Sequence, residues 1–85
     1  MSFFVYIARC KDKTLYTGYC KDLKFRENKH NIGEGAKYTK YRVPIKIIYS
    51  EEFETRKEAM ARERQIKSWT RNKKENLIKY RGSDE

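Results

Sequence analysis

The sequence predicts an α+β domain in which a three-stranded, mixed or antiparallel sheet is covered by helices, with the elements in the order β-β-α-β-α-α. Two aromatic and β-branched segments, 3–10 and 15–20, flank a short polar turn, which is typical of a β-hairpin. A third segment of this kind, 45–53, follows Pro44. Two capping boxes, each a Thr or Asn followed three residues later by Glu, then introduce helices.

The first segment (FFVYIARC) is apolar on both faces for most of its length, so we expect it to be the central strand. A turn over 11–14 would place Cys10 opposite Leu15 and Cys20 opposite Val5. In that register the two thiols lie at different ends of the ladder, beyond the reach of a disulfide. With a single histidine they also fall short of a structural zinc set. Free, reduced thiols are predicted.

Gly18, inside the second strand, indicates a β-bulge or a point where another group approaches the backbone closely. Asp22 is a suitable N-cap for a helix over about 23–31, and Gly33 is a suitable stop. Residues 33–44 have two glycines and no helical period. We therefore expect a loop there, and a functional one.

The two capping boxes are Thr55 with Glu58 and Asn72 with Glu75. The first predicts a long helix to about Trp69, and the second a short helix to about Tyr80. The helices complete the predicted β-β-α-β-α-α order.

The composition points to one domain that binds a polyanion. A chain of 85 residues is expected to form a single domain over residues 1–80, with a disordered tail at 81–85. Charged residues make up 39% of the chain and the net charge is +9, which favours nucleic acid over a membrane as the partner. The sequence contains no apolar run long enough to span a bilayer and no signal peptide, so no membrane contact and a cytoplasmic location are predicted.

Tyr6 and Tyr16 lie in the two strands of the predicted hairpin. Tyrosine is common in strands, so ordinary sheet packing is the simpler interpretation of each one. As a general base, a phenol with a pKa of about 10 needs neighbouring positive charge to lower that pKa.

Arg26 and His30 are four residues apart and therefore project from one face of the first helix. An arginine fork suits the equatorial oxygens of a phosphate in a pentacoordinate transition state. A solvated helix face and a structural histidine are the alternatives.

Glu63 falls between Ala59 and Ile66 on the apolar arc of the long helix, so its carboxylate needs a partner. A divalent cation such as Mg²⁺ or Mn²⁺ would serve. So would Lys67, four residues on, or Arg26 across the fold. The metal and the salt bridge both stay open.

Cations and aromatic side chains alternate in the loop after the first helix. This combination suits phosphate contacts and base stacking. The predicted nucleic-acid-binding residues are Lys37, Tyr38, Lys40, Tyr41 and Arg42.

Taken in order, these residues resemble the GIY-YIG nuclease superfamily, and in particular its short single-domain bacterial branch. The two signature triplets correspond to VYI at 5–7 and YTG at 16–18, with valine for the first glycine and threonine for isoleucine. Both tyrosines and Gly18 are retained. The resemblance covers about residues 3–80, and the matching positions are Tyr6, Tyr16, Arg26, His30 and Glu63.

The resemblance implies a metal-dependent DNA endonuclease. Glu63 would hold one Mg²⁺ or Mn²⁺ ion, a tyrosine would activate water, and Arg26 would stabilise the developing charge. His30 would position the base or the phosphate. Of the two tyrosines, Tyr6 is favoured as the base, with Tyr16 as its hydrogen-bonding partner.

Two other classes of function compete with this interpretation. One is a non-catalytic nucleic-acid-binding module that keeps the nuclease fold, and the other is an interaction protein for an RNA or ribosomal surface. Larger members of the family carry a second domain for substrate binding, for which 85 residues leave no room. Weak or structure-directed cleavage, or dependence on a partner protein, is therefore also expected.

Overall fold

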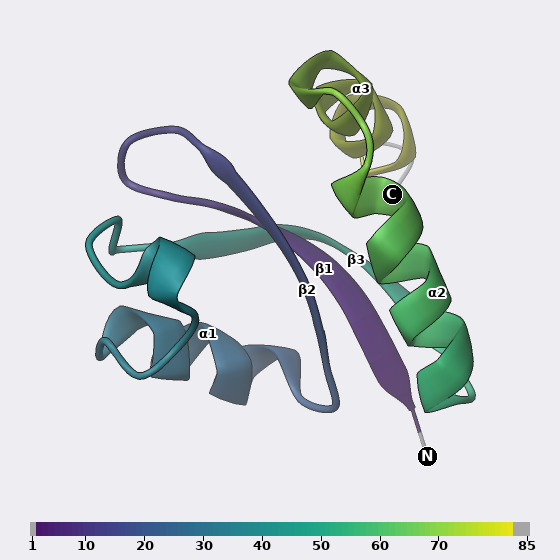
Figure 1. The fold of residues 1–85 in the computed structure, drawn as a ribbon, viewed down its shortest axis with the longest axis horizontal. Helices are drawn as coiled ribbons and strands as arrows, with labels where there is room; N and C mark the ends of the chain where they lie inside the picture. Colours follow the sequence, from purple (N-terminus) through teal and green to yellow (C-terminus); the bar gives the residue numbers. More distant parts are fainter. Residues whose placement is uncertain (1, 83–85) are drawn as a thin grey trace.

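A three-stranded antiparallel sheet separates the helices into two groups (Figure 1). The computed structural model describes residues 2–82. Strand β1 (Phe3–Arg9) lies between β2 (Leu15–Cys20) and β3 (Lys46–Phe53), which confirms the predicted central strand. The helices are α1 (Leu23–Asn31), the 3-10 helix η1 (Lys37–Thr39), α2 (Arg56–Lys67) and α3 (Arg71–Gly82). The α+β class and the β-β-α-β-α-α order are as predicted.

The hairpin turn is one residue shorter than the sequence indicated. The Cys10 amide donates to the Thr14 carbonyl at 2.9 Å, so the connection is three residues long. Its last residue, Lys13, adopts a left-handed conformation with φ 69°, as such three-residue hairpin loops require. Cys20 consequently lies opposite Phe4. The predicted pairing of Cys20 with Val5 is therefore wrong by one position.

This one-residue difference decides which side chains share a face of the sheet. In the observed register Tyr6 lies opposite Gly18, and Tyr16 lies opposite Ala8. Side chains of directly paired residues point to the same face, so both tyrosines project toward one side. The four-residue turn would have placed them on opposite faces. The three-residue turn therefore allows Tyr6 and Tyr16 to contribute to the same site.

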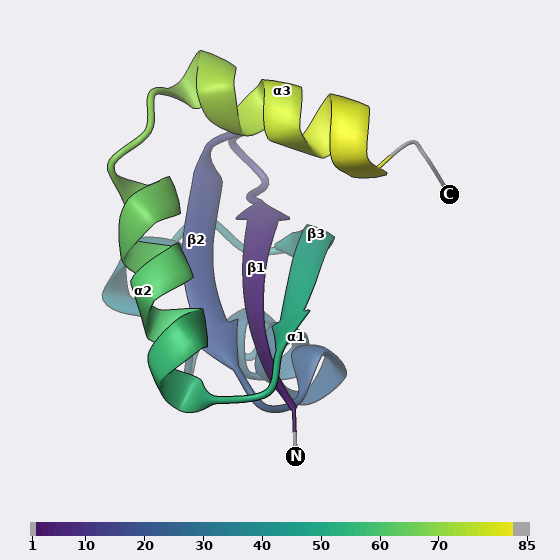
Figure 2. The same cartoon turned by 90° about the vertical axis from the view of Figure 1, so that its right-hand side faces the viewer.

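The two faces of the sheet carry separate apolar clusters. Val5 and Ile7 pack with Ala59 and Ile66 of α2. Tyr6 and Ala8 belong to the cluster on the other face, which Leu23 at the start of α1 joins. Figures 1 and 2 show α1 and α2 on opposite sides of the sheet, with α3 across one end. The positions of Cys10 and Cys20 agree with the prediction of free thiols, since both are buried and unpaired.

Helix α1 is fixed between its N-cap and the neighbouring strand. The Asp22 side chain accepts from the Phe25 amide at 2.9 Å, and Gly33 follows the helix with φ 84°, so the predicted cap and stop are confirmed. Glu27 accepts from the Ile47 amide at 2.7 Å. Asn31 makes two hydrogen bonds to the backbone of Ile45, of 2.6 and 3.1 Å. These contacts hold α1 against β3.

The predicted capping box at Thr55 is present, although α2 ends at Lys67 rather than near residue 69. The second box is not formed. Helix α3 begins earlier than expected, and the Lys73 amide donates to the Thr70 hydroxyl at 3.3 Å. Asn72 therefore lies inside the helix and is not its cap. The helix runs to Gly82, so the predicted tail at 81–85 is helical at its first two residues and otherwise lies outside the described residues.

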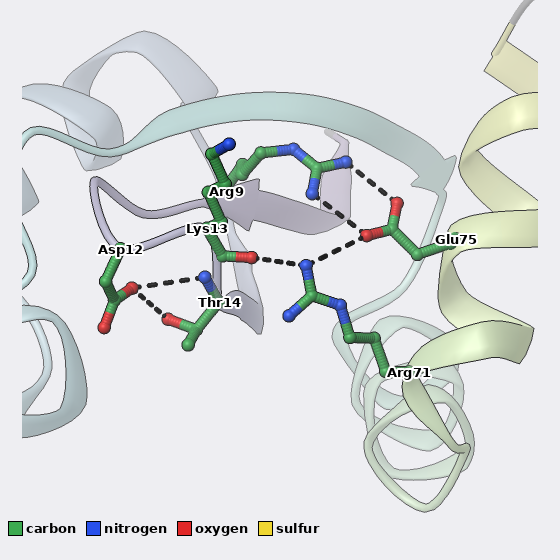
Figure 3. A network of polar contacts seen from close by, with 6 residues as sticks. All are labelled: Arg9, Asp12, Lys13, Thr14, Arg71 and Glu75. Carbon is green, nitrogen blue, oxygen red and sulfur yellow. Dashed lines mark hydrogen bonds and ion pairs between the residues drawn. The ribbon is translucent and has the colours of Figure 1, made fainter.

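Glu75 holds α3 against the hairpin instead of capping it (Figure 3). Its carboxylate accepts two hydrogen bonds from Arg9, at 2.8 and 3.0 Å, and pairs with Arg71 at 3.4 Å. Arg71 also donates to the Lys13 carbonyl at 2.7 Å. The bidentate geometry suits an arginine–carboxylate pair. Across residues 2–82, no helix is both long and apolar enough to cross a bilayer.

Candidate active site

Tyr6 and His30 meet beneath the β1–β2 face. Tyr6 is fully buried, with 0% of its surface exposed, and its hydroxyl lies 2.9 Å from His30 Nε2. The hydroxyl partner of Tyr6 is therefore His30 and not Tyr16. Gly18 leaves room for this arrangement, because a Cβ atom at that position would lie 2.6 Å from the Tyr6 hydroxyl oxygen. The ladder between β1 and β2 is regular at Gly18, so the close approach, and not a bulge, explains this glycine.

A chain of hydrogen bonds determines the tautomer of His30. The Thr39 hydroxyl donates to the Ala36 carbonyl at 2.9 Å, and its oxygen lies 2.7 Å from His30 Nδ1. Because that hydroxyl already donates elsewhere, it accepts from Nδ1–H. The unprotonated Nε2 is then left to accept from the Tyr6 hydroxyl. We call Tyr6, His30, Thr39 and the Ala36 carbonyl the buried relay.

Gly35 gives the loop enough room to close over the His30 ring. A Cβ atom at this position would lie 2.1 Å from His30 Nδ1 and 2.7 Å from its Cγ. Contacts this short cannot be accommodated without movement of the loop or the ring. The buried relay therefore depends on glycine at this position.

We expect Gly35→Ala to displace His30 and to lower the free energy of unfolding by roughly 1–3 kcal/mol, as overpacking of a tight site does. Chemical denaturation of the variant measures this. A double-mutant cycle with His30→Ala isolates the cause, because the ring that meets the new methyl group is then absent. The cost of Gly35→Ala should nearly vanish in the His30→Ala background. An unchanged cost there would mean that the loop backbone, and not the ring, excludes the methyl group.

Burial sets the protonation of the relay. Burial raises the pKa of Tyr6 above its ordinary value, the neighbouring Tyr16 adds to this, and the positive charge of Arg26 offsets only part of the increase. Burial and then Arg26 lower the pKa of His30. Both shifts favour the neutral form of the group concerned. At neutral pH the relay is therefore a phenol that donates to a neutral imidazole.

Tyr16, Arg26 and His30 line a common hollow of about 390 Å³ beside the relay. Tyr16 is half-buried and makes an edge contact with the His30 ring, with 5.3 Å between ring centroids. Arg26 is exposed one helical turn before His30, as their spacing predicts. The remaining lining residues are Phe25, Lys29, Glu34, Gly35 and Ala36. Lys29 and Glu34 pair with each other at 2.9 Å. Arg26 instead interacts with the Tyr6 hydroxyl, whose pKa it lowers against the effect of burial.

Glu63 lies on α2, on the other side of the sheet from α1. Its side chain is 17% exposed and pairs with Lys67 at 3.4 Å. Within residues 2–82 the ion-pair partner of Glu63 is thus Lys67 and not Arg26, and the structure does not bring Glu63 into the hollow of Tyr16 and His30. Arg56 precedes Glu63 by seven residues, which places the two on one face of α2 about 10 Å apart along its axis.

The loop predicted to bind nucleic acid folds beside Tyr16. The rings of Tyr38 and Tyr16 stack, with centroids 5.8 Å apart. Arg42 is engaged within the protein, because it pairs with Asp12 at 3.1 Å and donates to the Tyr38 carbonyl at 3.0 Å. Tyr41 is 87% exposed, and Lys37 and Lys40 are also exposed. Tyr38 is 40% exposed despite its stacking on Tyr16, so four of the five predicted residues are exposed, and Arg42 is the one that is partly buried.

Thr39 and Gly35 were not predicted as site residues. Thr39 is fully buried and contacts a histidine nine residues away, a distance that only the path of the loop decides. Two closely spaced glycines in the loop were the available signal. They indicated irregular backbone but not the ring that approaches it.

Comparison with known proteins gives a consistent result. Residues 2–76 match the family model described as the GIY-YIG catalytic domain. The chain is 56% identical over 80 residues to a UPF0213 protein of Staphylococcus aureus, which covers 94% of this chain and 98% of the relative. The solution NMR structure of a UPF0213 protein from Bacillus halodurans superposes with a TM-score of 0.64 at 42% identity, covering 98% of this chain and 88% of the other.

A second solution NMR structure, of a protein from E. faecalis, superposes with the same TM-score of 0.64 at 40% identity and covers 94% of this chain and 85% of that one. The family model and the relatives span nearly the whole chain, including both tyrosine triplets and the helix that carries Glu63. The chain therefore belongs to the GIY-YIG catalytic domain family.

Proposed function

We propose that the protein is a metal-dependent endonuclease that hydrolyses phosphodiester bonds in DNA. The observation that carries the proposal is the hollow in which Tyr16 and Arg26 meet a histidine of fixed tautomer. It combines a proton acceptor and an anion-binding fork at one concave site. Membership of a nuclease-type family supports the same reaction class.

Tyr16 is the tyrosine placed to act on the attacking water. A general base must lie within hydrogen-bond reach of the proton that it takes. Tyr16 lines the hollow, whereas Tyr6 is fully buried and its hydroxyl is directed to His30. The raised pKa of Tyr6 also opposes its ionisation. We therefore assign the base to Tyr16 and a positioning role to Tyr6, which holds the His30 ring against Tyr16.

Arg26 would bind the phosphate oxygens that gain charge as the water attacks. Its guanidinium can donate two parallel hydrogen bonds to a phosphate. It is held at the rim by α1, whose N-cap and contacts with β3 fix the helix. The backbone position of Arg26 is therefore set before substrate binds, and its side chain interacts with Tyr6.

Residues 2–82 contain no group of three or more His, Cys, Asp or Glu side chains that could hold a metal ion, so a cation would rest on the single carboxylate of Glu63 together with water and substrate. Mg²⁺ is commonly held by one or two carboxylates together with waters and substrate phosphates. Glu63 supplies one carboxylate, which is 17% exposed and pairs with Lys67 in the part of the chain that the structure describes. Glu63 would hold the ion, Mg²⁺ or Mn²⁺. Because Glu63 lies on the α2 side of the sheet, DNA bound at Tyr16 would have to pass around β2 for the ion to supply Lewis-acid stabilisation to the scissile phosphate and the leaving oxygen.

We expect Arg26→Lys to lose most of the cleavage activity, by about a hundredfold or more as for other pre-organised donors, because a point charge lacks the bidentate fork. Single-turnover cleavage rates at saturating protein measure this. Lys24→Gln is a matched control, since Lys24 is exposed on the same helix but does not line the hollow. Full activity in Arg26→Lys would show that the fork has no role.

A cleavage panel tests the proposed function. The purified protein is incubated with supercoiled, linear, single-stranded and branched DNA, and with RNA of the same sequences, in Mg²⁺, Mn²⁺ or EDTA. We expect cation-dependent cleavage of at least one DNA substrate. Binding that weakens steeply with salt but leaves every substrate intact would favour the non-catalytic binding module.

A further inference from the structure

A second hollow adjoins the first at the edge of the sheet. Its volume is about 480 Å³, and it shares Phe25 and Arg26 with the hollow of Tyr16. We call it the edge groove. It is lined by Phe3, Tyr19, Lys21, Phe25, Arg26 and Arg56, together with Cys20 and Asp22.

The edge groove connects the two sides of the sheet. Phe25 and Arg26 come from α1, Tyr19 from the outer strand β2, and Arg56 from α2. Figure 2 shows α2 alongside β2, with α1 behind the sheet. A chain leaving the hollow of Tyr16 through this groove would therefore run around β2 toward the α2 face that carries Arg56 and Glu63.

The groove joins aromatic surfaces to positive charge. Lys21 Nζ lies 5.5 Å from the centroid of the Phe3 ring. The Arg56 guanidinium lies 5.9 Å from the Tyr19 ring and donates to the Tyr19 hydroxyl at 3.2 Å. Phe25 is 59% exposed between the two hollows. The single acidic lining residue, Asp22, is engaged in capping α1.

We propose that the edge groove is a subsite for one unpaired nucleotide next to the scissile phosphate, with its base on Phe25 and its phosphate between Arg56 and Lys21. The inference rests on the proposed function and specifies its substrate. Flat aromatic surfaces beside cations are what unpaired nucleotides bind, through stacking and phosphate contacts. The volume lies within the range of small-ligand pockets, about 300–1,000 Å³. A base inside a duplex could not stack in this way, so the favoured substrates are single strands or junctions with an unpaired nucleotide beside the cut.

Binding of a short single-stranded DNA in EDTA, followed by fluorescence anisotropy, tests the subsite without cleavage. An abasic residue is moved along the oligonucleotide one position at a time, which removes a base without altering the phosphate charge. In the wild type, one position should weaken binding on the order of tenfold, as loss of one stacked base does. In Phe25→Ala that positional penalty should disappear, while Arg56→Gln weakens binding at all positions.

Arg64→Gln is the control, because Arg64 is an exposed arginine on the same helix and does not line the edge groove. It should retain both the affinity and the positional penalty. A wild type with no position-dependent penalty, or a Phe25→Ala variant that keeps it, would overturn the subsite. Equal affinity for a glutamate-rich peptide would overturn it as well.

The two proposals fail in different ways. If the panel shows no cleavage but the abasic penalty depends on Phe25, the subsite stands and the nuclease assignment does not. If cleavage occurs without such a penalty, the nuclease stands and the subsite is wrong.

Discussion

Replacement of Glu63 by alanine is expected to abolish cleavage while leaving DNA affinity nearly unchanged. Loss of the bound cation would remove several kcal/mol of transition-state stabilisation, so the rate should fall by more than about a hundredfold. Affinity should persist, because the cations of the hollow and the edge groove are intact. Stability should change little, since an ion pair with an exposed lysine contributes only about 0–1 kcal/mol.

Lys67→Ala distinguishes the ion pair of Glu63 with Lys67 from the proposed binding of a cation by Glu63. It removes the observed ion pair at 3.4 Å but leaves Glu63 free to hold a cation. We expect this variant to remain active, and its rate to depend on Mg²⁺ concentration as in the wild type. Rates are measured in single turnover, and affinities by anisotropy in EDTA. Parallel loss of rate and affinity in Glu63→Ala would instead assign the residue to binding or to folding.

The second large effect is expected for Tyr16→Phe. Loss of a general base costs about 10²- to 10⁴-fold in rate. The substitution keeps the ring, and with it the contacts to His30 and Tyr38. Unfolding and DNA binding should therefore be close to those of the wild type. Single-turnover rates as a function of pH measure the effect on chemistry.

Tyr6→Phe is the matched comparison. It leaves His30 Nε2 without its buried donor, so we expect a loss of about 1–3 kcal/mol in the free energy of unfolding. Its effect on the cleavage rate should be smaller than that of Tyr16→Phe, because Tyr6 acts through His30. The reverse order, with Tyr6→Phe the slower enzyme and equally stable, would return the role of base to Tyr6.

Local sequence signals were sufficient for most of the fold. Asp22 and Thr55 are good caps with suitable residues after them, and both helices begin where these signals indicated. The apolar run of the first strand indicated its central place in the sheet. These features depend on neighbouring residues alone, which is why the sequence reveals them.

The predictions of the hairpin turn, the strand register and the start of α3 were wrong, because tertiary contacts decide these features. Lysine is rarely left-handed, so Lys13 gave no sign of a three-residue turn. Thr70 and Asn72 are both acceptable caps, and Thr70 prevails where Arg71 and Glu75 hold α3 against the hairpin. The register error mattered most, because the observed turn brings Tyr6 and Tyr16 to one face.

The structure brings together four of the five residues predicted for the site. Tyr6, Tyr16, Arg26 and His30 gather on the α1 side of the sheet, because the observed register turns both tyrosines to that face. Glu63 lies on the α2 side. The contact of His30 with Thr39, and the space left by Gly35, depend on the path of the loop. No pattern along the chain encodes that path.

The most direct test of the account is DNA cleavage in ¹⁸O-labelled water, with mass spectrometry of the product ends. Attack by water on phosphorus predicts one ¹⁸O atom in the new terminal phosphate, only with Mg²⁺ or Mn²⁺ present. With Tyr16→Phe, labelled product should form about 10²- to 10⁴-fold more slowly, because the general base is lost. Product ends without the label would show phosphoryl transfer to another hydroxyl, and the absence of any cleavage would contradict a hydrolytic site altogether.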